Sequence, residues 1–212
     1  MSYLFGHPNE VLIYTAQHVV LVFVSLVIAC CMALPLGIFA ARNERVGPPI
    51  LAILGTLYTI PSLAILALLV QYAGLGFWSA VVMLVIYAQF LLVRNTAAAI
   101  RGVACAQRDA ARGLGMSVSE QLWRIELPQA FPVILGGVRI ATVSLIAIAT
   151  LASYVNAGGL GVLIFAGLSS DYAGKTVAGS VPVILLALAA DSVFRSLERR
   201  VATRSTSRNS KR

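Results

Sequence analysis

Long apolar runs without a charged residue predict a chain that crosses a membrane about five times. Residues 11–41 contain no charge, and neither do residues 46–93. A membrane-spanning helix needs about 20 apolar residues, so the first run suits one helix and the second run suits two. With the later apolar segments, the expected helices are Val19–Ala41, Pro49–Val70, Phe77–Ala99, Pro132–Tyr154 and Thr176–Phe194. The pattern therefore indicates an all-α, polytopic membrane helix bundle.

The second apolar run is divided by residues 71–76, QYAGLG, whose glycines favour a turn. Pro61 lies inside the helix before that turn, where a proline removes a backbone hydrogen bond and kinks the helix. Polar side chains in the apolar segments can face a pore or bond to a neighbouring helix, and the sequence leaves both open. The candidates are Thr59, Ser62, Asn95 and Asn156.

Residues 156–175 separate the last two expected helices and begin with NAGGLG, Asn156–Gly161, which we call the glycine segment. So many glycines do not suit a plain spanning helix, so the sequence predicts a short re-entrant or interfacial segment here. Gly158, Gly159 and Gly161 indicate close backbone packing or positive φ. We expect this segment to line an outer gate.

The longest polar interval between two apolar regions is Asp109–Pro128, and it lies within residues 104–130, which we call the polar loop. Asp109–Ala111 predicts a short helix, and Gly113 and Gly115 are expected to end it. A short helix held between two membrane segments, with an apolar side and a charged side, is suited to docking on a partner.

A second short helix is expected later in the polar loop. Ser117, with Glu120 three residues further on, matches a capping box and places the helix start near Ser117. Pro128 suits the first turn of the next long helix, where the missing N–H costs nothing. The apolar side of the short helix would be formed by Leu122, Trp123 and Ile125.

Composition supports an integral membrane protein with one main domain. The mean hydropathy of the 212 residues is +0.88, and 59% of them are hydrophobic. Only 11% are charged, against about 25% in soluble domains. We expect a short N-terminal segment (1–10), a transmembrane domain (11–194) and a basic tail (195–212) that is disordered beyond Ala202.

The positions of the basic residues predict the orientation. In the five-helix arrangement, every one of the 16 basic residues except Lys175 lies on or near the side of the polar loop and the tail. Cytoplasmic loops carry an excess of Lys and Arg, so we expect the polar loop and C-terminus inside and the N-terminus outside. The net charge of +8 is then a topology signal rather than a nucleic-acid surface, and the tail can rest on anionic lipid headgroups.

Other chemistry finds little support in the sequence. Cys30, Cys31 and Cys105 have no metal-ligand spacing, and we interpret His7 and His18 as polar residues at the membrane interface. The AGKT stretch resembles the end of a phosphate-binding loop but lacks its first glycine, so we expect no nucleotide site in this chain. No catalytic arrangement is visible, and the charges nearest the bilayer are interpreted as structural anchors that snorkel. Those charges are Arg94, Arg139 and Asp191.

The spacing of the polar loop resembles the EAA loop of ABC importer permeases. The matching positions are Asp109, Ala110, Ala111, Gly115, Ile125, Leu127 and Pro128. The one departure is Asp109, where the family usually has Glu. The resemblance implies that the polar loop is a coupling loop that sits in a groove of a cytoplasmic ATPase, with Ser117, Glu120 and Leu122 also at the coupling surface.

Four apolar segments resemble permeases that import glycine betaine, carnitine, choline and proline betaine. These segments are His18–Ile38, Thr59–Leu69, Leu92–Val103 and Leu151–Gly161. The resemblance implies a type I importer permease with a methionine-permease-like fold in a bacterial inner membrane. Its implied partners are a second permease subunit, identical or related, two ATPase subunits that carry ATP and Mg²⁺, and an extracytoplasmic substrate-binding protein.

Three other interpretations stay open from the sequence. A permease of the same architecture for methionine or another small amino acid would have the same loop. A secondary transporter would need an ion-coupling charge in the middle of the bilayer, and a membrane-assembly protein would not need the loop. Quaternary ammonium ligands favour aromatic cages, and no aromatic cluster is visible in the sequence. We therefore expect the selective site in the substrate-binding protein.

Overall fold

The computed structural model describes residue 3 and residues 6–209, and these form helices and connecting turns without a strand. Four helices are long and apolar enough to cross a membrane, and the bent pair α3–α4 would make five. The longer helices are α2 (Pro8–Arg42), α3 (Gly47–Thr59), α4 (Ser62–Ala73), α5 (Phe77–Arg101), α8 (Leu127–Ile148) and α10 (Ala173–Asn209). The shorter ones are α6 (Cys105–Gly113), α7 (Val118–Gln121), the π-helix η1 (Leu122–Glu126), the 3₁₀-helix η2 (Ala149–Val155) and α9 (Gly161–Ser169).

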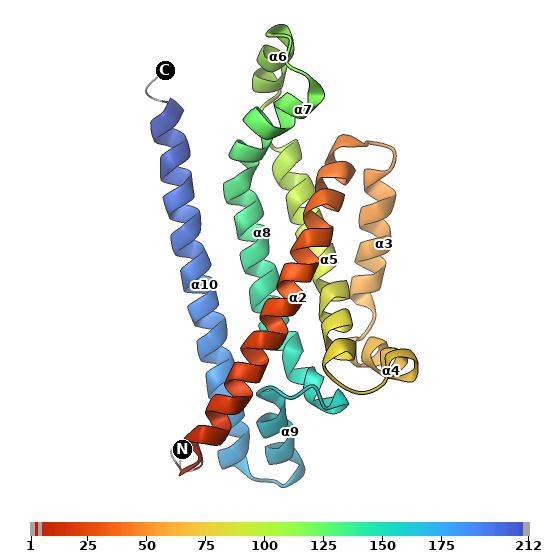
Figure 1. Ribbon diagram of the computed structural model, residues 1–212, viewed down its shortest axis with the longest axis vertical. Coiled ribbons are helices and arrows are strands. Elements are labelled where there is room, and N and C mark those ends of the chain that lie inside the picture. The colour runs from red at the N-terminus through yellow and green to blue at the C-terminus, as the bar shows by residue number, and fades with distance from the viewer. Residues whose placement is uncertain (1–2, 4–5, 210–212) are drawn as a thin grey trace.

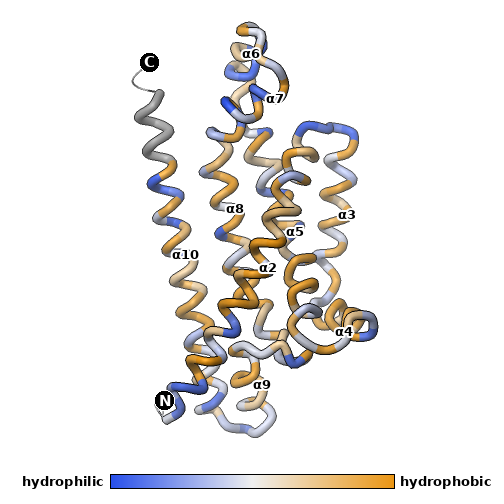
Figure 2. The backbone as a smooth tube through the Cα atoms, viewed as in Figure 1, coloured by the Kyte–Doolittle hydropathy of each residue, from blue (hydrophilic) through white to orange (hydrophobic). Residues whose placement is uncertain are grey.

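The helices run up and down along one long axis, and the two ends of the molecule differ in character (Figure 1). The polar loop (α6 and α7) lies at one end together with the C-terminal end of α10, whereas the N-terminus, α4 and α9 lie at the other end. Figure 2 shows hydrophobic residues along the middle of the helices and hydrophilic ones toward the ends, in the polar loop, the turn before α3, the upper part of α10 and near the N-terminus. An all-α membrane bundle with its termini at opposite ends is therefore the architecture that the apolar pattern predicts.

The helix expected over residues 49–70 is not one kinked helix but two helices that bend by 92°. Ile60 is extended (φ −65°, ψ 134°) because the residue before a proline avoids the helical region. Pro61 then starts α4, and its carbonyl accepts from the N–H of Ala64 at 2.9 Å. The carbonyl of Ile60 accepts a hydrogen bond from the hydroxyl of Tyr87 on α5. The break leaves α3 and α4 each too short to span a bilayer alone.

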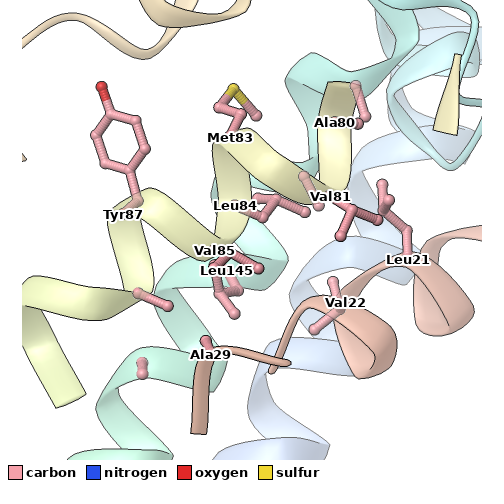
Figure 3. Packing of buried hydrophobic residues seen from close by; sticks show 14 of the residues in the cluster. Leu21, Val22, Ala29, Ala80, Val81, Met83, Leu84, Val85, Tyr87 and Leu145 are labelled. Atoms are coloured by element: carbon pink, nitrogen blue, oxygen red, sulfur yellow. The ribbon is translucent and has the colours of Figure 1, made fainter. Parts of the chain in front are cut away.

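The core is centred on α5, which packs between α2 and α8 (Figure 3). Met83 and Leu84 of α5, Leu21 of α2 and Leu145 of α8 are almost completely buried. Small residues four apart on α2 let its backbone approach α5 closely, as is common between membrane helices. These residues are Ser25, Ala29, Ala33 and Gly37. A Cβ added at Gly37 would lie 2.6 Å from the Cβ of Thr96 on α5, so only glycine fits there.

Charged side chains fasten α10 to α8. Arg139 of α8 lies 2.9 Å from a carboxylate oxygen of Asp191 and 2.8 Å from one of Glu198, both on α10. Arg195 completes the group with a 2.7 Å contact to Asp191. We expected Arg139 and Asp191 to be structural anchors that snorkel, whereas in the structure they bind each other and connect two helices. We expected disorder beyond Ala202, whereas α10 continues as a helix to Asn209; residues 210–212 lie outside the described residues.

Candidate functional site

The first helix of the polar loop, α6, ends in a glycine turn. Gly115 has φ +73°, and its N–H donates to the carbonyl of Arg112 at 2.9 Å. The N–H of Met116 donates to the carbonyl of Ala111 at 3.1 Å. This pair of bonds is the Schellman arrangement that closes a helix C-terminus with a left-handed residue. The prediction that Gly115 helps to end this helix is confirmed.

The capping box that the sequence predicts is present at the start of α7. The Ser117 hydroxyl accepts from the backbone N–H of Glu120 at 3.3 Å, and a Glu120 carboxylate oxygen accepts from the Ser117 N–H at 2.9 Å. α7 belongs to the polar end of the molecule, outside the apolar part of the bundle. The hydrogen bonds that the Glu120 carboxylate accepts from the Ser117 backbone and hydroxyl hold the pKa of Glu120 below its ordinary value. The carboxylate is therefore charged at neutral pH and keeps the helix start fixed.

A π-helix, η1, connects α7 directly to α8. Its five residues, LWRIE, are followed by a hydrogen bond from the N–H of Leu127 to the carbonyl of Leu122, five residues back. Such π-turns inside helices are rare in proteins. Where they occur, they often lie at functional sites. Leu122 packs against the buried cluster around Ile100, whereas Trp123 is 68% exposed. The expected single apolar side with both residues is therefore wrong.

Glu126, the last residue of η1, is only 6% exposed and lies between two arginines. One of its carboxylate oxygens is 3.0 Å from Arg42, the last residue of α2, and the other is 3.4 Å from Arg108 of α6. Arg42 also donates to the carbonyl of Val118 at 3.1 Å, and Arg108 donates to the carbonyl of Ile100. We call Arg42, Arg108 and Glu126 the ion-pair node.

The ion-pair node is a part of the site that sequence reasoning missed. Only an indirect signal was present in the sequence. Glu126 is an acidic residue between two apolar ones, and Arg42 closes the first apolar run. Nothing in the spacing shows that these residues, 84 positions apart, bind each other.

Other predicted residues of the polar loop divide into inward and outward groups. Ala111 is buried, and Ile125 and Leu127 are half-buried. Asp109 points outward, with its side chain 68% exposed and a contact of 3.5 Å to Arg112. Ala110 and Pro128 are also exposed. The outward surface thus combines the family-type acidic position with large apolar residues: Leu114, Val118 and Trp123.

An apolar cavity of about 600 Å³ lies between α2, α8 and the polar loop. Trp123 and Pro128 line it from the loop side, and Cys31 and Pro35 line it from α2. Phe131 of α8 lies at the same cavity. The exposed Trp123 ring therefore lies where the polar loop meets the membrane helices.

The glycine segment lies at the opposite end of the molecule and has the backbone that its sequence predicts. Gly158 (φ +77°) and Gly159 (φ +83°) are left-handed, as is Asn156 (φ 57°). A Cβ on Gly161 would overlap the carbonyl of Thr150 in η2. The segment is thus closely packed, and the short helix α9 follows it in place of a spanning helix.

Two neighbouring residues of α2, Gln17 and His18, bind the glycine segment and the end of α8. The side-chain oxygen of Gln17 accepts from the N–H of Gly159 at 3.0 Å. Nε2 of His18 lies 3.0 Å from the carbonyl of Ile146, and the ring is completely buried. His18 is therefore not a polar residue at the interface, as we expected, because α2 turns it into the bundle against the end of α8.

The remaining pore candidates do not form one group. Thr59 and Ser62 flank the α3–α4 corner at Pro61, where the Thr59 hydroxyl donates to the carbonyl of Thr56 at 2.7 Å. Asn95, in the later part of α5, donates to the carbonyl of Leu91 at 2.7 Å and packs against Gly137 of α8. For Asn95, packing between helices is thus the interaction that the structure shows.

An aromatic cluster that the sequence did not reveal forms near the N-terminus. The rings of Tyr3 and His7 stack at 4.4 Å, and Tyr172 meets Tyr3 edge-on at 5.7 Å. A hydrogen bond of 2.7 Å to Glu10 raises the pKa of Tyr3 to about 12. The ammonium group of Lys175 lies 5.6 Å from the centre of the Tyr3 ring. The Tyr3 ring thus already binds an ammonium group of its own chain.

Apolar spanning helices, a broken helix pair and a folded loop at one end define a polytopic permease subunit of a membrane transport system. The chain belongs to the family of binding-protein-dependent transport system inner membrane components, whose model matches residues 33–203. The protein is therefore a component of the inner membrane. The match covers most of the chain and includes the polar loop, whose spacing already resembled that of importer permeases.

Curated relatives agree over nearly the whole chain. The choline transport system permease protein OpuBB of Bacillus subtilis is 36% identical over 95% of this chain and 93% of its own length. The carnitine transport permease protein OpuCB of Listeria monocytogenes is 36% identical over 92% of this chain and 89% of its own. The osmoprotectant import permease protein OsmW of Salmonella typhimurium is 32% identical over 93% of this chain and 94% of its own.

Solved structures confirm the fold. An inward-facing structure of the MetNI methionine ABC transporter matches with a TM-score of 0.83, covering 92% of this chain and 98% of the other. An amino acid ABC transporter matches with a TM-score of 0.80 over 93% and 97%. Sequence identities are 19% and 18%, so these likenesses speak for the methionine-permease-like fold and not for the ligand.

Proposed function

We propose that this chain is the permease subunit of an ATP-driven importer for quaternary ammonium osmoprotectants such as choline, carnitine, glycine betaine and proline betaine. The observation that carries the proposal is the near full-length similarity to permeases for choline and carnitine. The folded polar loop supports it, because it supplies the docking element that an ATP-driven permease needs.

The polar loop is proposed to dock on a separate cytoplasmic ATPase, which would bind ATP and Mg²⁺. The exposed residues of the polar loop include a charged group, Asp109, and the apolar side chains of Leu114 and Val118. An interface that combines apolar anchors with a charged hydrogen-bond partner has the usual composition of a specific protein contact. The Ser117–Glu120 capping box and the Gly115 turn fix the direction of the two short helices toward that partner.

The sides and the ends of the bundle indicate where a second permease subunit, lipid and a substrate-binding protein would contact this chain. Large exposed apolar residues cover the outer sides of α2 and α10, including Phe23 and Leu188, and they would face lipid or a second permease subunit, identical or related. The end that carries the N-terminus and the glycine segment would receive ligand from an extracytoplasmic substrate-binding protein. With the polar loop inside, the N-terminus lies outside and the basic tail lies in the cytoplasm, near anionic headgroups.

The experiment that tests this proposal is co-purification of the ATPase with variants at Asp109. Removing one partner of a buried charged hydrogen bond at an interface costs about 2–5 kcal/mol. Asp109→Ala should therefore leave the protein in the membrane but weaken ATPase binding and abolish ligand-stimulated ATP hydrolysis. Asp109→Glu should be nearly silent, because it keeps the charge and restores the residue usual in the family.

Arg112→Gln is the matched control, since it removes the exposed neighbour of Asp109 and leaves the carboxylate in place. Full ATPase binding by Asp109→Ala would contradict the role of the polar loop. An importer of methionine or another small amino acid would show the same loop behaviour, and ligand specificity in uptake then distinguishes it.

A further inference from the structure

The ion-pair node connects elements that are far apart in the sequence. Arg42 ends α2, and one of its terminal nitrogens donates both to Glu126 and to the carbonyl of Val118, the first residue of α7. Arg108 belongs to α6 and donates to the carbonyl of Ile100, near the end of α5. The ion-pair node, with the Glu126 carboxylate between its two arginines, thus joins both short helices of the polar loop to two membrane helices.

We infer that Glu126 is a positioning residue that makes the polar loop and the end of α2 move as one body. A displacement of α7 by the ATPase is then passed directly to α2. This inference rests on the proposed function, because it assigns the path by which the docking surface acts on the membrane part.

The π-helix η1 is the local device that places Glu126. Its wider turn inserts a residue between α7 and α8, so Glu126 lies inward while Trp123 stays outward. A buried carboxylate is strongly unfavourable without its partners, and removing one partner of a buried pair is much more damaging than removing an exposed pair. The node therefore resists separation of the polar loop from α2.

Other acidic side chains of the polar loop do not make this connection. Asp109 pairs with Arg112, three residues away in the same helix, and Glu120 binds Ser117 and lies 3.9 Å from Arg124. These contacts stay within the loop. Glu126 differs because its partner Arg42 is 84 residues away, on α2.

α2 is suited to carry the displacement through the membrane. It is a single helix of 35 residues, which at 1.5 Å per residue is roughly 50 Å long. The node holds one end of it, and within its first third Gln17 binds Gly159 and His18 binds the carbonyl of Ile146. The same helix therefore contacts both the polar loop, through Arg42, and the glycine segment, through Gln17.

A distance measurement tests whether the loop and α2 move together. Spin labels are placed at Glu44→Cys, in the turn after α2, and Ser119→Cys, on α7, in a chain whose three native cysteines are replaced by serine. The complex with its ATPase is measured in lipid nanodiscs with and without ATP. With Glu126 present we expect one narrow distance distribution that ATP does not change. With Glu126→Gln we expect a distribution that broadens at rest and shifts on ATP binding.

Two further variants distinguish loss of the ion-pair node from a general loss of folding as the cause of the effect. Arg42→Gln should loosen the distance between the labels at least as much as Glu126→Gln, because it also removes the hydrogen bond to the Val118 carbonyl, and the double variant should be no worse than Arg42→Gln alone. Arg45→Gln is the control, since it removes an exposed positive charge three residues from Arg42 for which no ion pair is found within the described residues. It should behave as the unmodified chain.

Transport gives an independent measurement. Glu126→Gln should retain the ATPase and continue to hydrolyse ATP, while ligand uptake per ATP falls at least tenfold. An unchanged label distance in Glu126→Gln, or an ATP-dependent change with Glu126 present, would overturn the inference. If the unmodified chain binds no ATPase, the proposed function fails instead. The label distances in the permease alone then decide on the node, which is supported if Glu126→Gln broadens them and refuted if it does not.

Discussion

Gly115 shows how a single residue sets the direction of the docking surface. Its φ of +73° lies in the left-handed region, which costs other residues about 1–2 kcal/mol. A Cβ at this position would meet no atom within 4 Å. The requirement for glycine here is therefore conformational and not a matter of space.

Gly115→Ala should reduce ATPase co-purification and ligand-stimulated hydrolysis, because strain at the turn redirects α7. Gly113→Ala is a matched control, since Gly113 is helical and also has open space around its Cβ position. It should bind ATPase normally or slightly better, because alanine favours the helix. Equal behaviour of the two variants would show that the turn does not position the surface.

At the scale of elements, the glycine segment needs glycine for two reasons: its backbone has positive φ, and its neighbours leave little room for a side chain. Gly159 has φ +83°, and a Cβ added there would lie 3.1 Å from Nδ1 of the buried His18. Its N–H is bound by Gln17 of α2. A side chain would push the segment away from α2, at the end where we propose that ligand enters.

Gly159→Val should therefore impair uptake while the complex with the ATPase still assembles. Gly74→Val is the control, because Gly74 shares a positive φ (+77°) but has nothing within 4 Å of its Cβ position. Uptake assays in membrane vesicles compare the two. Normal uptake by Gly159→Val would contradict the gate hypothesis, and equal loss in both would point to backbone strain alone.

Elements determined by local rules were predictable from the sequence, and those determined by distant contacts were not. The capping box at Ser117 and the turn at Gly115 involve residues a few positions apart, so their spacing predicts them. The 92° break at Pro61 is more than the expected kink, and its Ile60 carbonyl is bound by Tyr87, 27 residues away. The ion-pair node depends in the same way on a distant partner, because Arg42 and Glu126 are 84 residues apart.

At the scale of the whole molecule, we propose distinct functions for the two ends of the bundle. The polar loop would bind the ATPase at one end, and the glycine segment would meet arriving ligand at the other. α2 spans the distance between them and contacts both. The described residues contain four, or with the bent pair five, candidate spanning helices, and we propose that a second permease subunit beside them completes the pore.

The most direct test of the account is uptake of labelled choline and glycine betaine by proteoliposomes that contain the permease, its ATPase and its substrate-binding protein. We expect uptake that requires ATP inside, stops when the ATPase is left out, and is competed by other quaternary ammonium compounds but not by methionine. Uptake that continues without the ATPase, or that methionine competes while choline does not, would contradict it.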